Sequence, residues 1–297
     1  MSSEFTFVVE KTCPVCGKSV KVVKVKSRLA AIGVDNDYCC HYRDFNPYLY
    51  HIWVCDGCGF AADEKVFLTA LSPVRRELIG NALMEHHVHF KFNEERSVPD
   101  GIASLKLAIF CAEVLKAPLA RQAGLAMRLA WIYRIDGQKE KEREASEQAL
   151  NLYIRSLETE HYPIDNLTDT MVMYLIGALY AELGERKKAV LYLSNIVGDK
   201  KNPITDAKLA KDARRLWQAV REQNQEESAQ ENASQEQNHH TVVQKAADKP
   251  KKKSGWPVEF VSKTDEDRIQ NRVDLFLSKD IRKWIVTEKI DGSSATY

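Results

Sequence analysis

The sequence predicts an α+β protein that is mainly α-helical. Two C-x-x-C-G motifs lie among β-branched and aromatic residues near the N-terminus, and a helical apolar period begins at Ile102. A later tract almost lacks large apolar residues, and such residues return after it. We therefore expect four parts: a small β domain over residues 1–70, an antiparallel helical domain over 71–221, a disordered linker over 222–255 and a short β-containing fragment over 256–297.

Length and charge limit the possible functions. The 43 basic and 42 acidic residues among 297 leave a net charge of +1, so any contact with nucleic acid has to be local. No apolar run approaches the roughly 18 residues of a membrane-spanning helix, and the N-terminal residues do not follow a secretion-signal pattern. We expect a cytoplasmic protein without a membrane partner, in which seven cysteines favour metal binding over disulfides.

Two cysteine pairs carry the strongest chemical signal in the sequence. The motifs CPVCG and CDGCG each place two thiolates on a tight turn, and the glycine after each pair lets backbone approach the sulfur atoms. Four thiolates complete a tetrahedral zinc ion and leave no position for a reactive water. The pattern predicts a zinc ribbon that holds structural Zn²⁺ through Cys13, Cys16, Cys55 and Cys58.

The segments beside these motifs are predicted to be strands. Val20–Arg28 and Tyr48–Cys55 are rich in β-branched and aromatic residues and partly alternate. Between them, Cys39, Cys40 and His41 offer additional ligands. We favour buried thiols here, because the four-ligand set is already complete and free cysteines pack as small hydrophobic residues, while a contact with the metal stays open.

The segments CPVCGK, DNDYC and NPYLYHIWVCDGCGFAA together resemble the start of a bacterial family of unknown function. That family joins a zinc ribbon to a helical repeat region. The resemblance extends over about Lys11–Ala219 and is most specific at the cysteine motifs and at Asn46–Pro47. It implies the two-part architecture and brings no known reaction with it.

A histidine cluster follows the predicted ribbon. His86, His87 and His89 lack the i, i+4 spacing of a helical metal site, and no H-E-x-x-H motif is present. We interpret them as exposed or packed residues and not as catalytic ones.

The helical region contains two related segments. Gly177, Tyr180 and Gly184 stand at the offsets of a tetratricopeptide repeat (TPR), and an earlier segment aligns Ala130, Tyr133 and Gly137 with them. The two tyrosines are further apart than the usual repeat of about 34 residues, which predicts an extended second helix or loop in the first copy. A TPR-like array could bind a peptide or protein partner, or could simply cover the ribbon, and both interpretations stay open.

The tract over residues 222–255 is rich in Gln, Glu, Asn, Ser and Lys and cannot bury enough apolar surface to offset its ordering entropy. Its basic end could contact phosphates. We favour a solubilising tether, because a cluster of four lysines is small: Lys249, Lys251, Lys252 and Lys253.

The last segment, Trp256–Tyr297, resembles the N-terminal edge of ATP-dependent RNA ligases, which are covalent nucleotidyltransferases. The motif SKTDEDRIQN precedes EKIDGSSATY, as it does in that family. The resemblance implies that Lys289 attacks the α-phosphate of ATP, with Mg²⁺ drawing off charge, and carries AMP toward an RNA end. The implied nucleotide-binding residues are Glu288, Asp291, Gly292, Arg268 and Asn271.

The ligase-like segment is short. The later strands, carboxylates and lysines of such a domain do not follow it, so a nucleophile at Lys289 would lack its electrostatic surroundings. We therefore expect this chain alone to be inactive as a ligase. The alternatives are an interaction protein whose tail is a fusion remnant, and a ribbon that contacts nucleic acid directly.

Overall fold

A computed structural model of the chain describes residues 4–27, 29–86, 92, 95–198 and 206–225. By its contacts the chain divides into two units, Met1–Glu236 and Gln237–Tyr297, and the second lies entirely outside the described residues. The described residues therefore all belong to the first unit. The predictions for residues 226–297, including the ligase-like segment and most of the linker, also lie outside the described residues.

The N-terminal part consists of three two-stranded antiparallel hairpins, β1–β2, β3–β4 and β5–β6. A short 3₁₀ helix, Pro47–Tyr50, precedes β5. The strands are β1 Thr6–Thr12, β2 Ser19–Val25, β3 Ala31–Val34, β4 Cys40–Tyr42, β5 Ile52–Val54 and β6 Ala61–Asp63. In β1–β2, Thr12 pairs with Ser19, and in β5–β6, Val54 pairs with Ala61, so a cysteine motif forms the turn of each hairpin.

The strand predicted over Tyr48–Cys55 was only half right. Its first part is the 3₁₀ helix, and only Ile52–Val54 is a strand. Pro47 fixes the backbone for a helical start, and the Asn46 side chain accepts a hydrogen bond from the Tyr48 amide at 3.0 Å. This local cap outweighs the β propensity of the aromatic residues.

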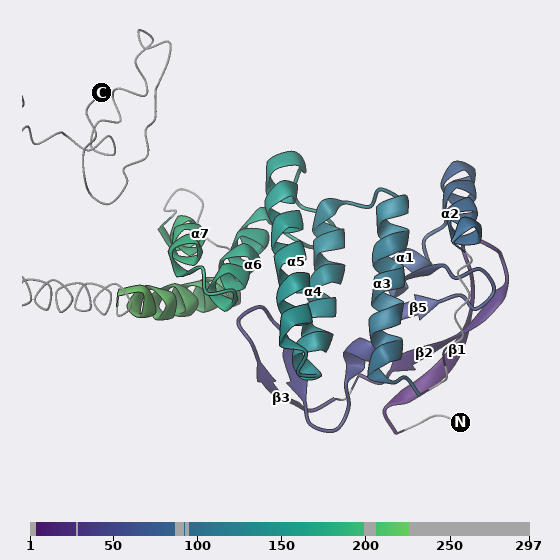
Figure 1. Cartoon of the computed structure of the whole chain (residues 1–297), viewed down its shortest axis with the longest axis horizontal. Coiled ribbons are helices and arrows are strands. Elements are labelled where there is room, and N and C mark those ends of the chain that lie inside the picture. Colours follow the sequence, from purple (N-terminus) through teal and green to yellow (C-terminus); the bar gives the residue numbers. More distant parts are fainter. Residues whose placement is uncertain (1–3, 28, 87–91, 93–94, 199–205, 226–297) are drawn as a thin grey trace, which may run out of the picture. The chain divides into compact units, whose positions relative to one another are not determined.

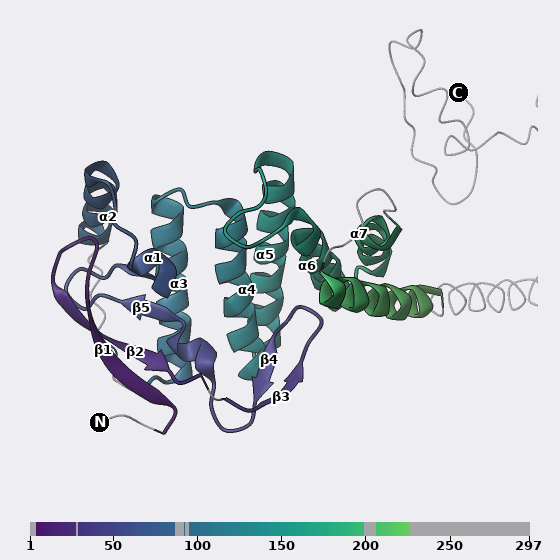
Figure 2. The same ribbon diagram turned by 180° about the vertical axis from the view of Figure 1, so that it is seen from behind.

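Helices make up the rest of the described chain. Figure 1 shows α3, α4 and α5 side by side, and Figure 2 shows the same helices from behind. The helices are α1 Glu64–Phe67, α2 Pro73–Glu85, α3 Val98–Val114, α4 Leu119–Ile135, α5 Lys139–Thr159, α6 Asp169–Glu182 and α7 Arg186–Gly198, followed by a helix over residues 207–225. The mainly helical α+β fold predicted from the sequence is confirmed.

The two predicted repeat segments end their first helices in the same way. After α4, the Gln138 amide donates to the Tyr133 carbonyl at 2.9 Å, and after α6, the Glu185 amide donates to Tyr180 at 2.8 Å. Gly137 and Gly184 supply the positive φ angles of +77° and +83° that such a helix end requires. Within each repeat the paired helices pack together, α4 on α5 and α6 on α7.

The extra length of the first repeat lies where the sequence predicted it. Helix α5 has 21 residues, whereas α7 has 13, and a loop follows α5 before α6 begins. The loop residue Glu160 folds back and accepts hydrogen bonds from the first amides of α4, Leu119 at 2.7 Å and Ala120 at 3.1 Å. The insertion therefore caps the first helix of its own pair, at the end where a helix favours negative charge.

Two buried clusters form the core. The first joins the strands to the helices that follow, because Ile52 and Phe60 are packed in one cluster with Leu105 of α3 and Ile132 of α4. The second lies among α4 to α7 and the helix over residues 207–225. The strands around the cysteine motifs therefore share a core with the first helices.

Candidate functional site

The two cysteine motifs adopt the same turn. The Cys13 amide donates to the Lys18 carbonyl at 2.9 Å, and the Cys55 amide donates to the Phe60 carbonyl at 2.8 Å. The glycine of each motif closes the turn by donating to the carbonyl of the first cysteine, Gly17 at 3.0 Å and Gly59 at 2.8 Å. Both glycines have positive φ, which residues with a Cβ adopt at a cost.

The turns bring four sulfur atoms together. The Cys13 and Cys58 Sγ atoms lie 3.7 Å apart, and those of Cys16 and Cys55 lie 3.6 Å apart. All four atoms lie within 4.8 Å of one another. Zn–S bonds of about 2.3 Å in a tetrahedron place the sulfur atoms about 3.8 Å apart, so the observed spacing suits a zinc ion.

Burial and mutual hydrogen bonding shape the chemistry of these thiols. Cys13 and Cys55 are buried, Cys58 is half-buried and Cys16 is exposed. Hydrogen bonds among the thiols lower the pKa of Cys55 and raise the pKa values of Cys13 and Cys58. A metal ion binds the thiolate form, so filling this cluster with a metal ion would release protons.

A second cluster lies apart from the four cysteines. Ligand atoms of Asp35, Cys39 and His41 lie within 4.8 Å of one another, on the β3–β4 hairpin. The His41 Nε2 atom contacts Asp35 Oδ2 at 2.8 Å, and Arg134 Nη1 donates to the same oxygen at 2.8 Å. Burial raises the pKa of Cys39 to about 12, which keeps it a neutral thiol. Cys39 is fully buried, as expected, whereas Cys40 is only half-buried. Arg134 already supplies a positive charge beside Asp35.

The cluster belongs to a hairpin that is docked onto the helical array. Asp37, only 3% exposed, accepts hydrogen bonds from Trp131 Nε1 at 2.7 Å and from Arg134 Nη2 at 3.0 Å. The Tyr174 hydroxyl donates to the Asn36 carbonyl at 2.7 Å, and the Tyr38 hydroxyl donates to Asp212 at 3.3 Å. The β3–β4 turn thus occupies a surface formed by α4, α6 and the helix over residues 207–225. No local pattern in the sequence predicts this contact.

Carboxylates outnumber cations around Arg134. Its guanidinium bonds to Asp35, Asp37 and Glu142, and it also pairs with Glu182. The pKa of Glu182 is raised to about 8 by burial and by the charge of Asp37. Asp35 differs: burial alone would raise its pKa, but hydrogen bonds from His41 and Arg134 hold that pKa below its ordinary value. These contacts hold the β3–β4 hairpin against the helices, and Arg134 lies at their centre.

The remaining predicted site residues fall into two groups. His86 ends α2 and packs edge-to-face on Phe110, with ring centroids 5.1 Å apart, whereas His87 and His89 lie outside the described residues. The ligase-like residues also lie outside them: Arg268, Asn271, Glu288, Lys289, Asp291 and Gly292. Their roles stay predictions. Among the described residues, no helix is long and apolar enough to cross a bilayer.

The facing cysteine turns and the paired helices define a four-cysteine β domain built onto a TPR-like helical array. Residues 8–220 match a family model described as an uncharacterized protein conserved in bacteria (DUF2225), and the chain belongs to this family. The resemblance to a bacterial family of unknown function over about Lys11–Ala219 is thereby confirmed. Searches of curated proteins and of solved structures found no significant match, and the family match ends before the ligase-like segment.

Proposed function

We propose that residues 8–220 form a zinc-stabilised scaffold whose helical array binds a peptide or protein partner. The observation that carries the zinc part is the four-sulfur cluster, with its 3.6 and 3.7 Å separations, at the tips of two hairpins. Four thiolates leave no position for water, so this zinc ion stabilises structure and does not activate a nucleophile. It ties β1–β2 to β5–β6, whose buried residues share a core with α3 and α4.

Cobalt substitution tests the proposed coordination. Co²⁺ in a tetrahedral four-thiolate site gives intense thiolate-to-metal absorption, which we expect from the metal-exchanged protein. Cys16→Ser removes one sulfur and should weaken and shift this absorption. Cys40→Ser is the matched control, because Cys40 lies outside the four-sulfur cluster. A spectrum that changes as much with Cys40→Ser as with Cys16→Ser would contradict this ligand set.

A groove beside α5 supports the partner part of the proposal. A shallow groove of about 850 Å³ lies between the α3–α4 connection and α5. Its lining is largely polar and charged and includes Glu144, Glu147, Gln148, Asn151 and Arg155 of α5. The helical surface around Trp131 and Arg134, in contrast, is covered by the chain's own β3–β4 hairpin. The hairpin does not cover the groove beside α5, so that groove suits a polar peptide.

Matched charge reversals on α5 test this surface. Glu144 lines the groove, whereas Glu158 is an exposed residue of the same helix that does not line it. We expect Glu144→Lys to abolish crosslinking of a partner to the full chain, and Glu158→Lys to preserve it. Equal crosslinking with both variants would rule out this groove as the partner surface.

For Trp256–Tyr297 we propose, on the resemblance alone, that Lys289 accepts AMP when the segment is part of a complete nucleotidyltransferase domain. The support is the order of the two motifs in the sequence. A longer chain that continues with further ligase motifs should acquire an acid-labile label from labelled ATP and Mg²⁺. Lys289→Ala should abolish the label and Lys283→Ala should keep it, and labelling that survives Lys289→Ala would end the proposal.

A further inference from the structure

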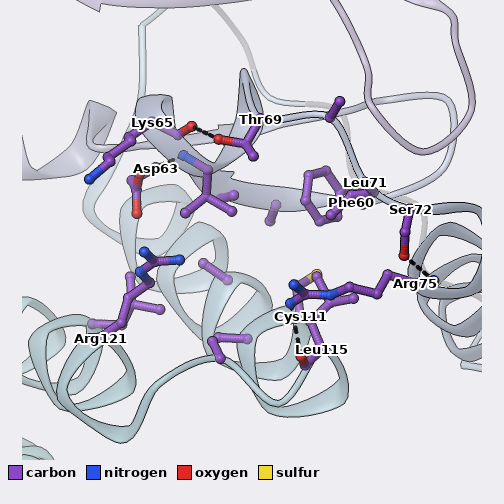
Figure 3. A pocket seen from close by; sticks show the side chains of 18 residues that line it. Phe60, Asp63, Lys65, Thr69, Leu71, Ser72, Arg75, Cys111, Leu115 and Arg121 are labelled. Atoms are coloured by element: carbon purple, nitrogen blue, oxygen red, sulfur yellow. Dashed lines mark hydrogen bonds between the residues drawn. The ribbon is translucent and has the colours of Figure 1, made fainter. Parts of the chain in front are cut away.

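A second cavity lies beside the β5–β6 hairpin. It has a volume of about 520 Å³, within the usual range of small-molecule sites. Figure 3 shows the side chains that line it, which come from β6, α1, the start of α2, α3, α4 and the segments that connect them. Phe60 and Ala61, directly after the second cysteine motif, form part of its wall.

The interior of this cavity is apolar. The buried side chains can solvate a hydrocarbon chain but offer it no charged partner. These lining residues are each at most 9% exposed: Phe60, Leu71, Ala108, Cys111, Leu115 and Leu125. Burial also raises the pKa of the Cys111 thiol to about 11, so it is neutral.

Charged side chains lie at the edge, and most of them are engaged. Asp63 caps α1 by accepting from the Val66 amide at 3.0 Å. Lys65 and Arg121 both pair with Asp165, Arg121 at 2.7 Å. Even with Asp165 counted, the cavity edge is net positive, because two acidic residues face three basic ones.

Arg75 is the exception among these groups. Its Nη2 atom donates to the Leu115 carbonyl at 3.0 Å, which fixes the guanidinium at the cavity edge (Figure 3). No carboxylate pairs with Arg75 in the part of the chain that the structure describes. A guanidinium has five N–H donors in a planar fork, so others remain for a ligand.

We infer that this cavity binds a small amphipathic carboxylate, with the carboxylate on Arg75 and a single apolar chain over the Phe60 and Cys111 side chains. The neutral interior excludes a second charge, and the free donors at one end favour an anion over an alcohol or an amine. The cavity lies between four helices, a strand and their connecting segments, so it suits one free chain and not the flat surface of a membrane.

Calorimetric titration of the full-length, zinc-loaded protein with decanoate, below its micelle-forming concentration, tests the inference. We expect saturable binding of decanoate at one site, much weaker binding of decanol and no binding of decylamine. Failure of decanoate to bind would overturn the inference, as would binding of phosphatidylglycerol vesicles without binding of free decanoate.

Two neighbouring arginines provide a matched pair of variants. Arg75 and Arg76 are both exposed residues of α2, but only Arg75 lines the cavity. Arg75→Glu should weaken decanoate binding about tenfold, because it replaces a charge-assisted hydrogen bond with repulsion. Arg76→Glu, which changes the net charge equally, should have less than about a twofold effect. Equal effects of the two variants would contradict a specific role for Arg75.

The apolar part has its own test. Ala112 is half-buried in the cavity wall, and Ala112→Phe should fill part of the space and weaken decanoate binding. Circular dichroism and zinc content verify that the variant is folded. A folded variant with unchanged affinity would contradict the site, and if the variant does not fold, the Arg75 and Arg76 pair decides. The inference does not depend on the proposed partner groove.

Discussion

Arg134 is the residue on which the hairpin and the helical array depend together. Its side chain is 16% exposed and bonds to carboxylates from β3–β4, α5 and α6. An arginine suits this position because its planar fork can serve several carboxylates at once. Removing it would leave Asp37, which is almost fully buried, without a cation.

We therefore expect Arg134→Met to lower the free energy of unfolding by about 3–5 kcal/mol, the usual cost of breaking a buried ion pair. Chemical denaturation measures the change. Arg143→Met is the control, because Arg143 forms an exposed pair with Glu147 at 2.9 Å and should cost less than about 0.5 kcal/mol. Similar losses for both variants would show that the Arg134 centre does not hold the fold.

Glu182 gives this centre a pH dependence. Its folded pKa of about 8 lies above its ordinary value of 4.5, so between these values the folded state holds a proton that the unfolded state has lost. The contribution of Glu182 to stability is therefore full below about pH 4.5 and is lost as pH rises through about 8. Asp35 titrates below this window, because its pKa is lowered from 3.8.

Glu182→Gln mimics the protonated side chain and should flatten the dependence of stability on pH between about 5 and 8. Denaturation at several pH values, compared with the unchanged protein, measures the slope. The opposite outcome is that the stability of the unchanged protein rises across this window and that of Glu182→Gln rises less. This outcome would contradict the sign of the pKa shift.

At the scale of the elements, a close helix contact defines the second repeat. Helix α6 approaches α7 at Gly177, where an added Cβ atom would lie 2.7 Å from Leu193 Cγ. Leu193 is fully buried and cannot move away without leaving the core. The glycine is thus required by packing, as the sequence pattern of the repeat indicates.

We expect Gly177→Ala to destabilise the protein by about 1–3 kcal/mol, the range for overpacking a core. Gly124→Ala in α4 is the matched control, because the nearest atom to its added Cβ is Arg128 Nη1, the end of a long side chain, at 3.2 Å. That variant should be neutral or stabilising, since alanine favours helix. Thermal unfolding of both variants measures the difference, and an equal loss in the two would contradict the close contact.

Local patterns predicted some elements of the fold and missed others. The cysteine turns and repeat glycines were predictable because their spacing and backbone needs are local in sequence. The docking of Asp37 was not, because its partner Arg134 lies 97 positions away and an acidic turn otherwise looks solvent-exposed. The 3₁₀ helix at Pro47 was missed because a side-chain cap overrode strand propensity. The cavity edged by Arg75 depends on five elements meeting and leaves no sequence signature.

At the scale of the whole molecule, the four-cysteine cluster links the β hairpins to the helices. Both cysteine turns lie on hairpins that share the first buried cluster with α3 and α4. A metal ion bound by the four cysteines would stabilise the first buried cluster as well as the two cysteine turns, because binding free energy at a structural site adds to the free energy of folding. Helices α6 and α7 lie in the second cluster and should feel the loss of metal less directly.

Native mass spectrometry combined with thermal unfolding can test for a structural zinc ion on Cys13, Cys16, Cys55 and Cys58. We expect one Zn²⁺ per chain, a lower unfolding temperature after the ion is chelated, and recovery when zinc is returned. Cys58→Ser should lose the zinc and the chelator's effect together. The contrary result is that protein produced with ample zinc contains no zinc and unfolds at the same temperature with or without chelator. That result would rule out a structural zinc ion at these cysteines.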